Sequence, residues 1–175
     1  MKTIQIGTPP ALYVGTYAKY NAGSIKGAWL SLADYPDQAS FLEAARALHD
    51  DEEDPELMFQ DYEGFPSSWY CESAPPGAIL WDWLKLGGRD GEAFALYAEH
   101  IGDGASLSGF EDAYAGTFDS EADFAEDLAD STGAEHTNLP SWICIDWQAT
   151  WMSALRFDYF CDRDSEDTLH FFRNT

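Results

Sequence analysis

The N-terminal part of the chain contains LYVGTYAKYNAGSIKGAWLSL, residues Leu12–Leu32, which carries the clearest secondary-structure pattern in the sequence. Residues 12–17 are rich in aromatic and β-branched side chains, which favour extended strands. Asn21-Ala22-Gly23 supplies the residue types of a tight turn, and residues 24–32 resume as a strand. The stretch therefore predicts an antiparallel hairpin.

The rest of the chain mixes helix and strand patterns without regular alternation. Asp34-Tyr35-Pro36 is predicted to open a helix in which Phe41, Leu42, Ala45 and Leu48 share an apolar face. A strand is predicted over 57–62 and a terminal hairpin over 157–161 and 168–172. Helices are predicted over 79–84, 94–101 and 146–155, and another helix is predicted to follow Ser120. This mixture indicates an α+β fold. Turn signals divide it into an N-terminal sheet-plus-helix domain (1–66), a central helical domain (67–108) and a C-terminal α+β domain (109–175).

Negative charge runs through all three parts. The 175 residues include 32 Asp and Glu against 9 Lys and Arg, a formal net charge of −23. The three parts carry −7, −4 and −12, and the 66 residues between Arg89 and Arg156 contain 14 carboxylates and no basic side chain. Aromatic residues make up 15% of the chain, which excludes an acidic disordered chain. Binding to nucleic acid or to an anionic membrane is excluded too, because both require Lys and Arg.

We expect a soluble, cytoplasmic protein. No stretch reaches 18 apolar residues, so no membrane span is predicted, and the opening MKTIQIG lacks the apolar region of a signal peptide. Cys71, Cys144 and Cys161 form no CxxC pair, which argues against a disulfide framework or a structural zinc site. We expect them to be small buried apolar residues.

Neither a catalytic motif nor a cofactor motif occurs in the sequence. His49, His100, His136 and His170 are scattered, and GxSxG, Walker A and GxGxxG patterns are absent. Asp162–Asp167 begins like a calcium loop but lacks the required glycine and final glutamate, so a solvated turn is expected. Among 32 carboxylates some pair will always have a spacing that suits glycosidase chemistry, so such a pair carries little information. The seven tryptophans fit packing in the core better than stacking against a sugar. We therefore expect no enzymatic activity, no metal and no cofactor.

The helix predicted after Ser120 conflicts with ordinary helix stability. Ser120 and Asp123 match the spacing of a capping box. Asp123/Asp127 and Glu126/Asp130 are like-charged pairs four residues apart, each of which costs about 0.2–0.5 kcal/mol. Asp127 and Asp130 also stand near the helix end where the dipole disfavours anions. Such a conflict between local stability and sequence points to function.

Three interpretations of this anionic surface remain open on composition and spacing. The charge could serve solubility or adaptation to high salt, could bind divalent cations, or could imitate nucleic acid for a basic DNA-binding partner. Duplex DNA carries one charge per ~1.7 Å of axis, so 23 charges correspond to roughly 40 Å of duplex. Carboxylates three or four residues apart on a helix stand ~5–6 Å apart at Cβ, comparable with successive phosphates on a strand.

Four stretches of the chain resemble the ArdA antirestriction proteins. The most specific is LYVGTYAKYNAGSIKGAWL, residues 12–30, which is similar to the family's strand, Tyr-Asn-x-Gly turn and Gly-x-Trp strand. The others are DYEGFP at 61–66, FEDAYAGTFDSEADFAE at 110–126, and Ile145-Asp146-Trp147 with the terminal hairpin. The resemblance runs along nearly the whole chain.

The resemblance implies an elongated three-domain protein that dimerises through its C-terminal part and imitates bent B-form DNA. Such a protein occupies the DNA-binding groove of type I restriction-modification enzymes, protects incoming mobile DNA, and needs no cofactor. Carried over to this chain, the carboxylates that would stand in for phosphates in the C-terminal block are Glu111, Asp112, Asp119, Glu121, Asp123, Glu126, Asp127, Asp130 and Glu135. Those that would extend the imitation outward are Asp34, Asp37, Glu43, Asp50, Asp51, Glu52, Glu53 and Asp54.

Overall fold

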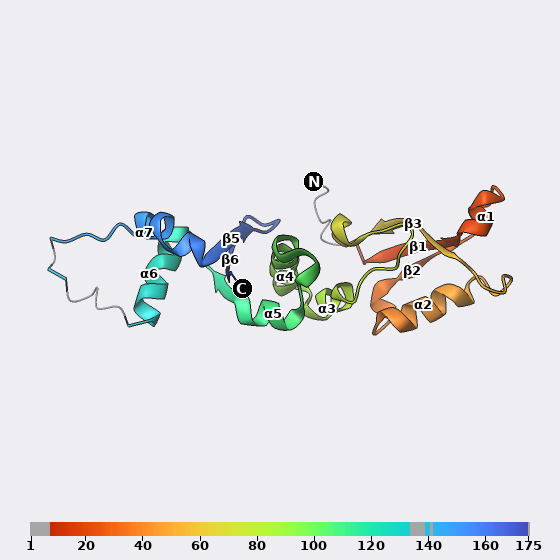
Figure 1. Cartoon of the computed structure of the whole chain (residues 1–175), viewed down its shortest axis with the longest axis horizontal. Coiled ribbons are helices and arrows are strands. Elements are labelled where there is room, and N and C mark those ends of the chain that lie inside the picture. The colour runs from red at the N-terminus through yellow and green to blue at the C-terminus, as the bar shows by residue number, and fades with distance from the viewer. Residues whose placement is uncertain (1–7, 134–138, 141, 175) are drawn as a thin grey trace. The chain divides into compact units, whose positions relative to one another are not determined.

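The computed structural model describes residues 8–133, 139–140 and 142–174. The chain divides into two compact units, Met1–Gly91 and Glu92–Thr175. Each unit contains one three-stranded antiparallel sheet accompanied by helices (Figure 1). The predicted α+β class is therefore confirmed, whereas the finer division into domains 1–66, 67–108 and 109–175 stays a prediction. Among the described residues, no helix is long and apolar enough to cross a membrane.

The N-terminal unit contains a sheet in the order β2-β1-β3. Its elements in chain order are β1 (Ala11–Thr16), α1 (Tyr17–Asn21), β2 (Ala28–Ser31), η1 (Leu32–Asp34), α2 (Gln38–Ala47), β3 (Leu57–Glu63), η2 (Ser67–Trp69) and α3 (Ile79–Leu86). The central strand β1 pairs with both neighbours, and its residues Leu12 and Val14 are fully buried. The predicted hairpin and third strand are confirmed, whereas the short helix α1 between β1 and β2 is not predicted by the sequence pattern.

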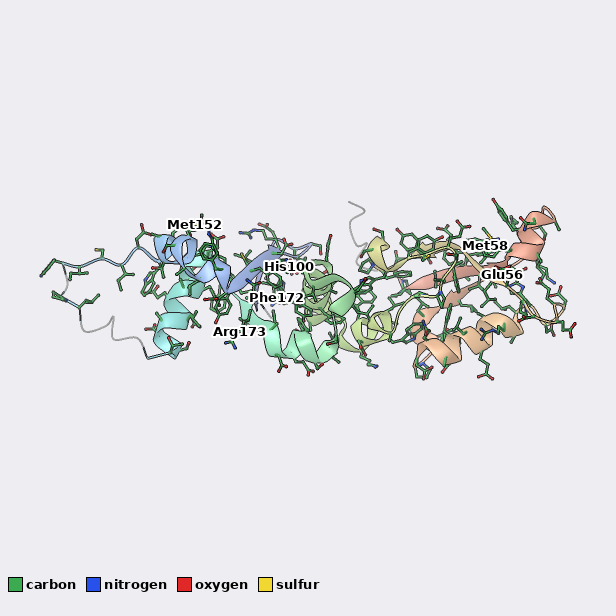
Figure 2. All side chains as sticks on the ribbon, viewed as in Figure 1. Glu56, Met58, His100, Met152, Phe172 and Arg173 are labelled. Carbon is green, nitrogen blue, oxygen red and sulfur yellow. The ribbon has the colours of Figure 1, made fainter. Side chains whose placement is uncertain are left out.

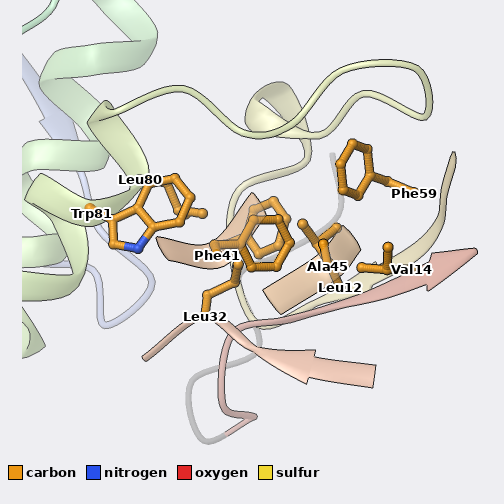
Figure 3. Close-up of a cluster of buried hydrophobic side chains, with 9 residues drawn as sticks. Leu12, Val14, Leu32, Phe41, Ala45, Phe59, Leu80 and Trp81 are labelled. Atoms are coloured by element: carbon orange, nitrogen blue, oxygen red, sulfur yellow. The ribbon is translucent and has the colours of Figure 1, made fainter. Parts of the chain in front are cut away.

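Aromatic side chains from α2, β3 and α3 fill the core of this unit (Figure 3). Phe41 on α2 is fully buried, and its ring lies 6.1 Å from that of Phe59 and 6.0 Å from that of Trp81. Trp81 also donates a hydrogen bond of 3.0 Å from its indole nitrogen to the carbonyl of Tyr35. The predicted apolar face of α2 is therefore the face that closes the core.

Helix α2 begins later than the sequence predicts. Residues Leu32–Asp34 form the single turn η1, in which Leu32 is fully buried, so Asp34-Tyr35-Pro36 does not open the helix. The cap is Asp37, whose side chain accepts hydrogen bonds from the backbone nitrogen of Ser40 at 2.8 Å and from its hydroxyl at 2.6 Å. A side-chain cap fixes a helix start more strongly than a nearby proline does.

The second sheet has the order β4-β6-β5. The remaining elements in chain order are α4 (Gly88–Ile101), η3 (Gly102–Gly104), α5 (Leu107–Ala113), β4 (Tyr114–Thr117), α6 (Glu121–Ser131), α7 (Trp147–Ser153), η5 (Leu155–Phe157), β5 (Tyr159–Arg163) and β6 (Leu169–Arg173). The predicted terminal hairpin and the helices α4, α6 and α7 are confirmed. Helix α5 and strand β4 are not predicted, because β4 has only four residues and a register shift before Gly116.

Stacked rings also build the core of the Glu92–Thr175 unit. Phe171 on β6 is fully buried and stacks on Phe124 of α6 with 4.5 Å between ring centroids. The ring of Phe160 on β5 stacks on Phe172 of β6 and on His100 of α4. Figure 2 labels Phe172 and His100. Aromatic stacking therefore gives this highly charged unit a dense apolar interior.

One polar chain is buried in the same unit. The His170 imidazole is fully buried, with Nε2 2.9 Å from Oδ2 of Asp164 and Nδ1 3.0 Å from the Tyr114 hydroxyl. The Asp164 carboxylate also accepts the backbone N–H groups of Glu166 and Thr168, and its side chain is 1% exposed. The prediction of a solvated turn over Asp162–Asp167 is therefore wrong for Asp164, whose side chain anchors the turn from inside.

Two predictions about buried side chains need correction. Cys71 and Cys144 are exposed and Cys161 is half-buried, so the expectation of buried cysteines is wrong. Trp81 and Trp151 are buried as expected, but Trp142 is 79% exposed and Trp29 is 44% exposed. Hydrophobicity alone does not show which aromatic side chains a small sheet has room to cover.

The two aromatic cores predict a unit-specific loss of stability. Phe41→Ala and Phe171→Ala should each lower the unfolding free energy of their own sheet by about 3–5 kcal/mol, because each leaves a cavity among buried rings. Site-resolved hydrogen exchange would measure this loss, and Ile25→Ala, at a side chain 74% exposed, is the matched control. Equal loss of protection in both sheets from either substitution would contradict separate cores.

Candidate functional site

Helix α6 presents a row of carboxylates on the side opposite its apolar face. Ser120 caps the helix as predicted, accepting the backbone N–H of Asp123 at 3.1 Å and donating its hydroxyl to the Asp123 carboxylate at 2.7 Å. Phe124 and Ala125 are buried beneath the helix, which directs the neighbouring acidic side chains outward. We call the exposed row the α6 stripe; it consists of Asp123, Glu126, Asp127 and Asp130.

A carboxylate from a second helix shares a surface hollow with one member of the α6 stripe. Asp112 of α5 and Asp127 of α6 line the same surface hollow of about 200 Å³, together with Arg173 of β6. Within the described part of the chain, the carboxylates of Asp112, Glu126 and Asp127 make no ion pair or hydrogen bond. Two helices that are separate in sequence thus each contribute an exposed carboxylate to this hollow, which Arg173 also lines.

The other predicted residues of this unit occupy less uniform positions. Glu111 and Asp119 are exposed, whereas Glu121 is half-buried and accepts a hydrogen bond of 2.7 Å from Gln148. Glu135 lies outside the described residues. Residues 92–175 contain 18 carboxylates against 3 arginines, so the unit as a whole is strongly anionic.

In the N-terminal unit, the predicted carboxylates fall into two groups. Asp34, Glu43, Asp50, Glu53 and Asp54 are exposed and make no hydrogen bond or ion pair within the described residues. The remaining three, Asp37, Asp51 and Glu52, are engaged by the chain itself, Asp37 as the cap of α2. Hydrogen bonds from Ser40 lower the pKa of the Asp37 carboxyl.

Asp51 and Glu52 bind the ammonium group of Lys19. Its Nζ lies 2.7 Å from Oδ1 of Asp51, 3.0 Å from Oε1 of Glu52 and 2.8 Å from Nδ1 of His49. Thr16 donates its hydroxyl to the same Glu52 oxygen at 2.7 Å. We call these five residues the Lys19 network.

The network shifts the pKa values of its members in the directions that its charges require. Hydrogen bonds from Lys19 and Lys26 lower the pKa of Asp51 to about 2. Burial lowers the pKa of Lys19, but its hydrogen bonds to Asp51 and Glu52 outweigh that effect, so the pKa is raised overall. Burial, and then the charge of Lys19, lower the pKa of His49. A neutral imidazole can therefore accept the hydrogen bond from Lys19.

The same place contains the atoms of a possible metal site. One ligand atom each from His49, Asp51 and Glu52 lie within 4.8 Å of one another, and a histidine with two carboxylates suits a divalent transition metal. The Lys19 ammonium, however, contacts all three of these side chains. A metal ion could bind there only after Lys19 had moved away.

Sequence reasoning missed exposed carboxylates on the sheet of the N-terminal unit. Asp61 and Glu63 both lie on β3 with exposed side chains, two residues apart and therefore on the same side of the strand. The alternation of side chains along the predicted strand 57–62 is the pattern that could have predicted an exposed Asp61. The anionic surface of this unit is thus wider than the acidic runs of the sequence suggest.

The lowered pKa of His49 predicts how stability depends on pH. Between pH 7 and pH 5 the unfolded chain takes up a proton near the ordinary histidine pKa of about 6.5, whereas folded His49 takes it up only at lower pH. The unfolding free energy contributed by this residue is therefore present above pH 6.5 and lost as the pH falls. His49→Asn keeps an acceptor for Lys19 without titrating, so urea denaturation should show a flatter pH dependence than in the wild type. Identical pH dependence in both proteins would contradict this prediction.

Comparison with known protein families identifies the chain. The model of the antirestriction protein (ArdA) family matches residues 12–160. A search of curated proteins found no match. The family match begins in β1 and ends in β5, and so takes in both units, the α6 stripe and the Lys19 network. Since it covers well over half of the chain, the protein belongs to the ArdA family of antirestriction proteins, which are inhibitors and not enzymes.

Proposed function

We propose that this protein imitates B-form DNA and blocks type I restriction-modification enzymes by occupying their DNA-binding groove. It acts in the cytoplasm, where such enzymes meet incoming mobile DNA, and it requires no cofactor. The proposal includes the elongated, three-domain form that the family resemblance implies. Family membership supports inhibition of restriction, and the finer mechanism rests on the arrangement of charge.

The observation that carries the proposal is the row of exposed carboxylates on α6, of which Asp127 shares one hollow of the surface with Asp112 of α5. Carboxylates at this spacing repel one another and weaken the helix, which has no basic residue in its last turn. A basic groove that binds phosphates would relieve this repulsion on contact. Side chains that destabilise the free protein and stabilise the complex are what a mimic of DNA requires.

Electrostatic attraction then provides both the rate and the salt dependence of binding. Long-range attraction between a strongly anionic protein and a cationic groove accelerates encounter at low ionic strength. Because DNA and its mimic compete for the same Lys and Arg side chains, both should bind more weakly as salt rises. Shape then decides which basic proteins are bound.

A homodimer formed through the C-terminal part belongs to the same proposal. Five of the eight large apolar side chains that are exposed within the described residues lie between Leu139 and Phe157. Trp142 is 79% exposed, Phe157 65%, and Met152, labelled in Figure 2, 47%. Exposed apolar groups gathered in one segment favour burial against another protein surface.

Competition with DNA tests the proposed mechanism directly. A labelled duplex with a type I recognition site is bound by its methyltransferase, and the protein is added stepwise at fixed salt. We expect displacement at near-stoichiometric amounts, with Glu126→Gln/Asp127→Asn displacing DNA about three- to tenfold less well, because charges at an interface chiefly change the association rate and the salt dependence.

The matched control for this experiment is Asp90→Asn/Glu99→Gln, which removes the same charge from exposed positions on α4. Equal losses in both double variants would mean that only total charge matters. No displacement by the wild type at large excess would reject DNA mimicry in favour of a role of the charge in solubility.

The proposed dimer predicts a change of oligomeric state. Trp142→Ser/Phe157→Ser should weaken self-association at least about tenfold, because large aromatic side chains dominate interface energies. Sedimentation equilibrium would measure the dissociation constant. Ile25→Ser removes an equally exposed apolar side chain from the other unit, and the same weakening there would contradict an interface in the C-terminal part.

A further inference from the structure

Lys19 is the most completely engaged cation in the described part of the chain. An ammonium group has three N–H donors, and three acceptors surround this one: Nδ1 of His49 and the carboxylates of Asp51 and Glu52. The Lys19 side chain is 12% exposed, whereas that of Lys26, which reaches the other oxygen of Asp51 at 3.2 Å, is 65% exposed. The position of Lys19 is therefore set by contacts on all its donors.

Backbone contacts hold the two ends of this arrangement. Thr16 is fully buried at the end of β1 and caps α1, which fixes the backbone from which Lys19 extends. On the other side, the backbone nitrogen of Glu52 donates to the carbonyl of His49 at 3.0 Å. Lys19 thus links the end of the sheet to the run that follows α2.

That run, Asp50–Asp54, is five consecutive carboxylates. Adjacent like charges repel, and an unattached run of this kind would spread over many conformations. Two members, Asp51 and Glu52, turn toward Lys19, while Asp50, Glu53 and Asp54 are exposed and make no hydrogen bond or ion pair within the described residues. Lys19 therefore separates the run into an inner pair, which it binds together with Lys26 on Asp51, and an outer set.

We propose that Lys19 is a positioning residue for the partner-binding surface: its ammonium is a built-in counter-ion that fixes the acidic run, so that Asp50, Glu53 and Asp54 face a basic partner in a preset arrangement. The inference rests on the proposed function and adds a residue of opposite charge to it. Ordering a mobile charged segment during association has an entropic cost that weakens binding. A backbone fixed in advance through Asp51 and Glu52 lowers that cost for the three exposed carboxylates that it carries.

Electrostatics and positioning predict opposite effects for the same substitution. Lys19→Met makes the formal net charge more negative, from −23 to −24, so attraction to a cationic groove alone would make binding tighter. If Lys19 positions the run, the variant binds more weakly although it is more negative. Thr16→Val tests the same arrangement without any change of charge, because it removes the hydroxyl that holds Glu52.

The experiment uses the competition titration with the full-length protein at fixed salt. We expect Lys19→Met to displace the labelled duplex about tenfold less well than the wild type, which corresponds to about 1.4 kcal/mol, and Thr16→Val to change in the same direction. Arg89→Gln is the matched control, since it removes one positive charge from an exposed position. It should displace DNA as well as the wild type or slightly better.

Hydrogen exchange of the free variants supplies a readout that does not depend on the partner. In Lys19→Met the Glu52 amide should exchange faster, while amides of the central strand β1 keep their protection. The inference would be overturned if the Lys19→Met variant displaced DNA as well as the wild type or better. An unchanged hydrogen-exchange rate of the Glu52 amide in that variant would overturn it too. A wild-type protein that displaces no DNA would reject the proposed function itself, a result distinct from either of these.

Discussion

Repulsion among carboxylates is the physical constraint to which the rest of this molecule responds. A chain with a net charge of −23 must fold although its own surface opposes compaction. The stabilising interactions are concentrated in two interiors of stacked rings, with Phe41 fully buried in one unit and Phe171 in the other. Inside each core there is little charge, and where a carboxylate is buried, as at Asp164, hydrogen bonds surround it.

The chain deals with repulsion differently at its two acidic regions. At the run after α2, Lys19 binds two of the carboxylates, and the others remain exposed. On α6 no basic residue is available in the last turn, and the like-charged side chains are left exposed. The first arrangement favours a fixed geometry and the second a high local charge density. A surface that must match a cationic groove in both shape and potential benefits from having both.

Patterns of local sequence predicted most of the secondary structure. The β1–β2 hairpin, the apolar face of α2, the Ser120 cap of α6 and the terminal hairpin all depend on neighbouring residues, so their patterns are readable. Strand β4 was missed because four residues with a bulge at Gly116 carry no alternation. The start of α2 was misplaced because the Asp37 cap is a side-chain contact that a proline signal does not report.

The candidate surface was predictable as a set of residue types but not as an arrangement. Sequence spacing placed Glu126 and Asp127 on one helix, yet the meeting of Asp112 with Asp127 at one hollow depends on how α5 and α6 pack. The role of Lys19 could not be predicted at all, since its three acceptors lie 30 or more residues away in the sequence. Tertiary contacts of this kind decide which carboxylates remain available to a partner.

The cysteines, which were expected to be buried, give the protein two natural attachment points for probes. Cys71 in the first unit and Cys144 in the second are both exposed, and hydrogen bonding to Ser73 lowers the pKa of Cys71. Burial and the nearby carboxylate of Glu121 raise the pKa of Cys161 to about 11, which keeps that thiol protonated and slow to react. A maleimide donor and acceptor would therefore attach preferentially to one thiol in each unit. Energy transfer between them would follow the separation of the two units, free and enzyme-bound, without any engineered residue.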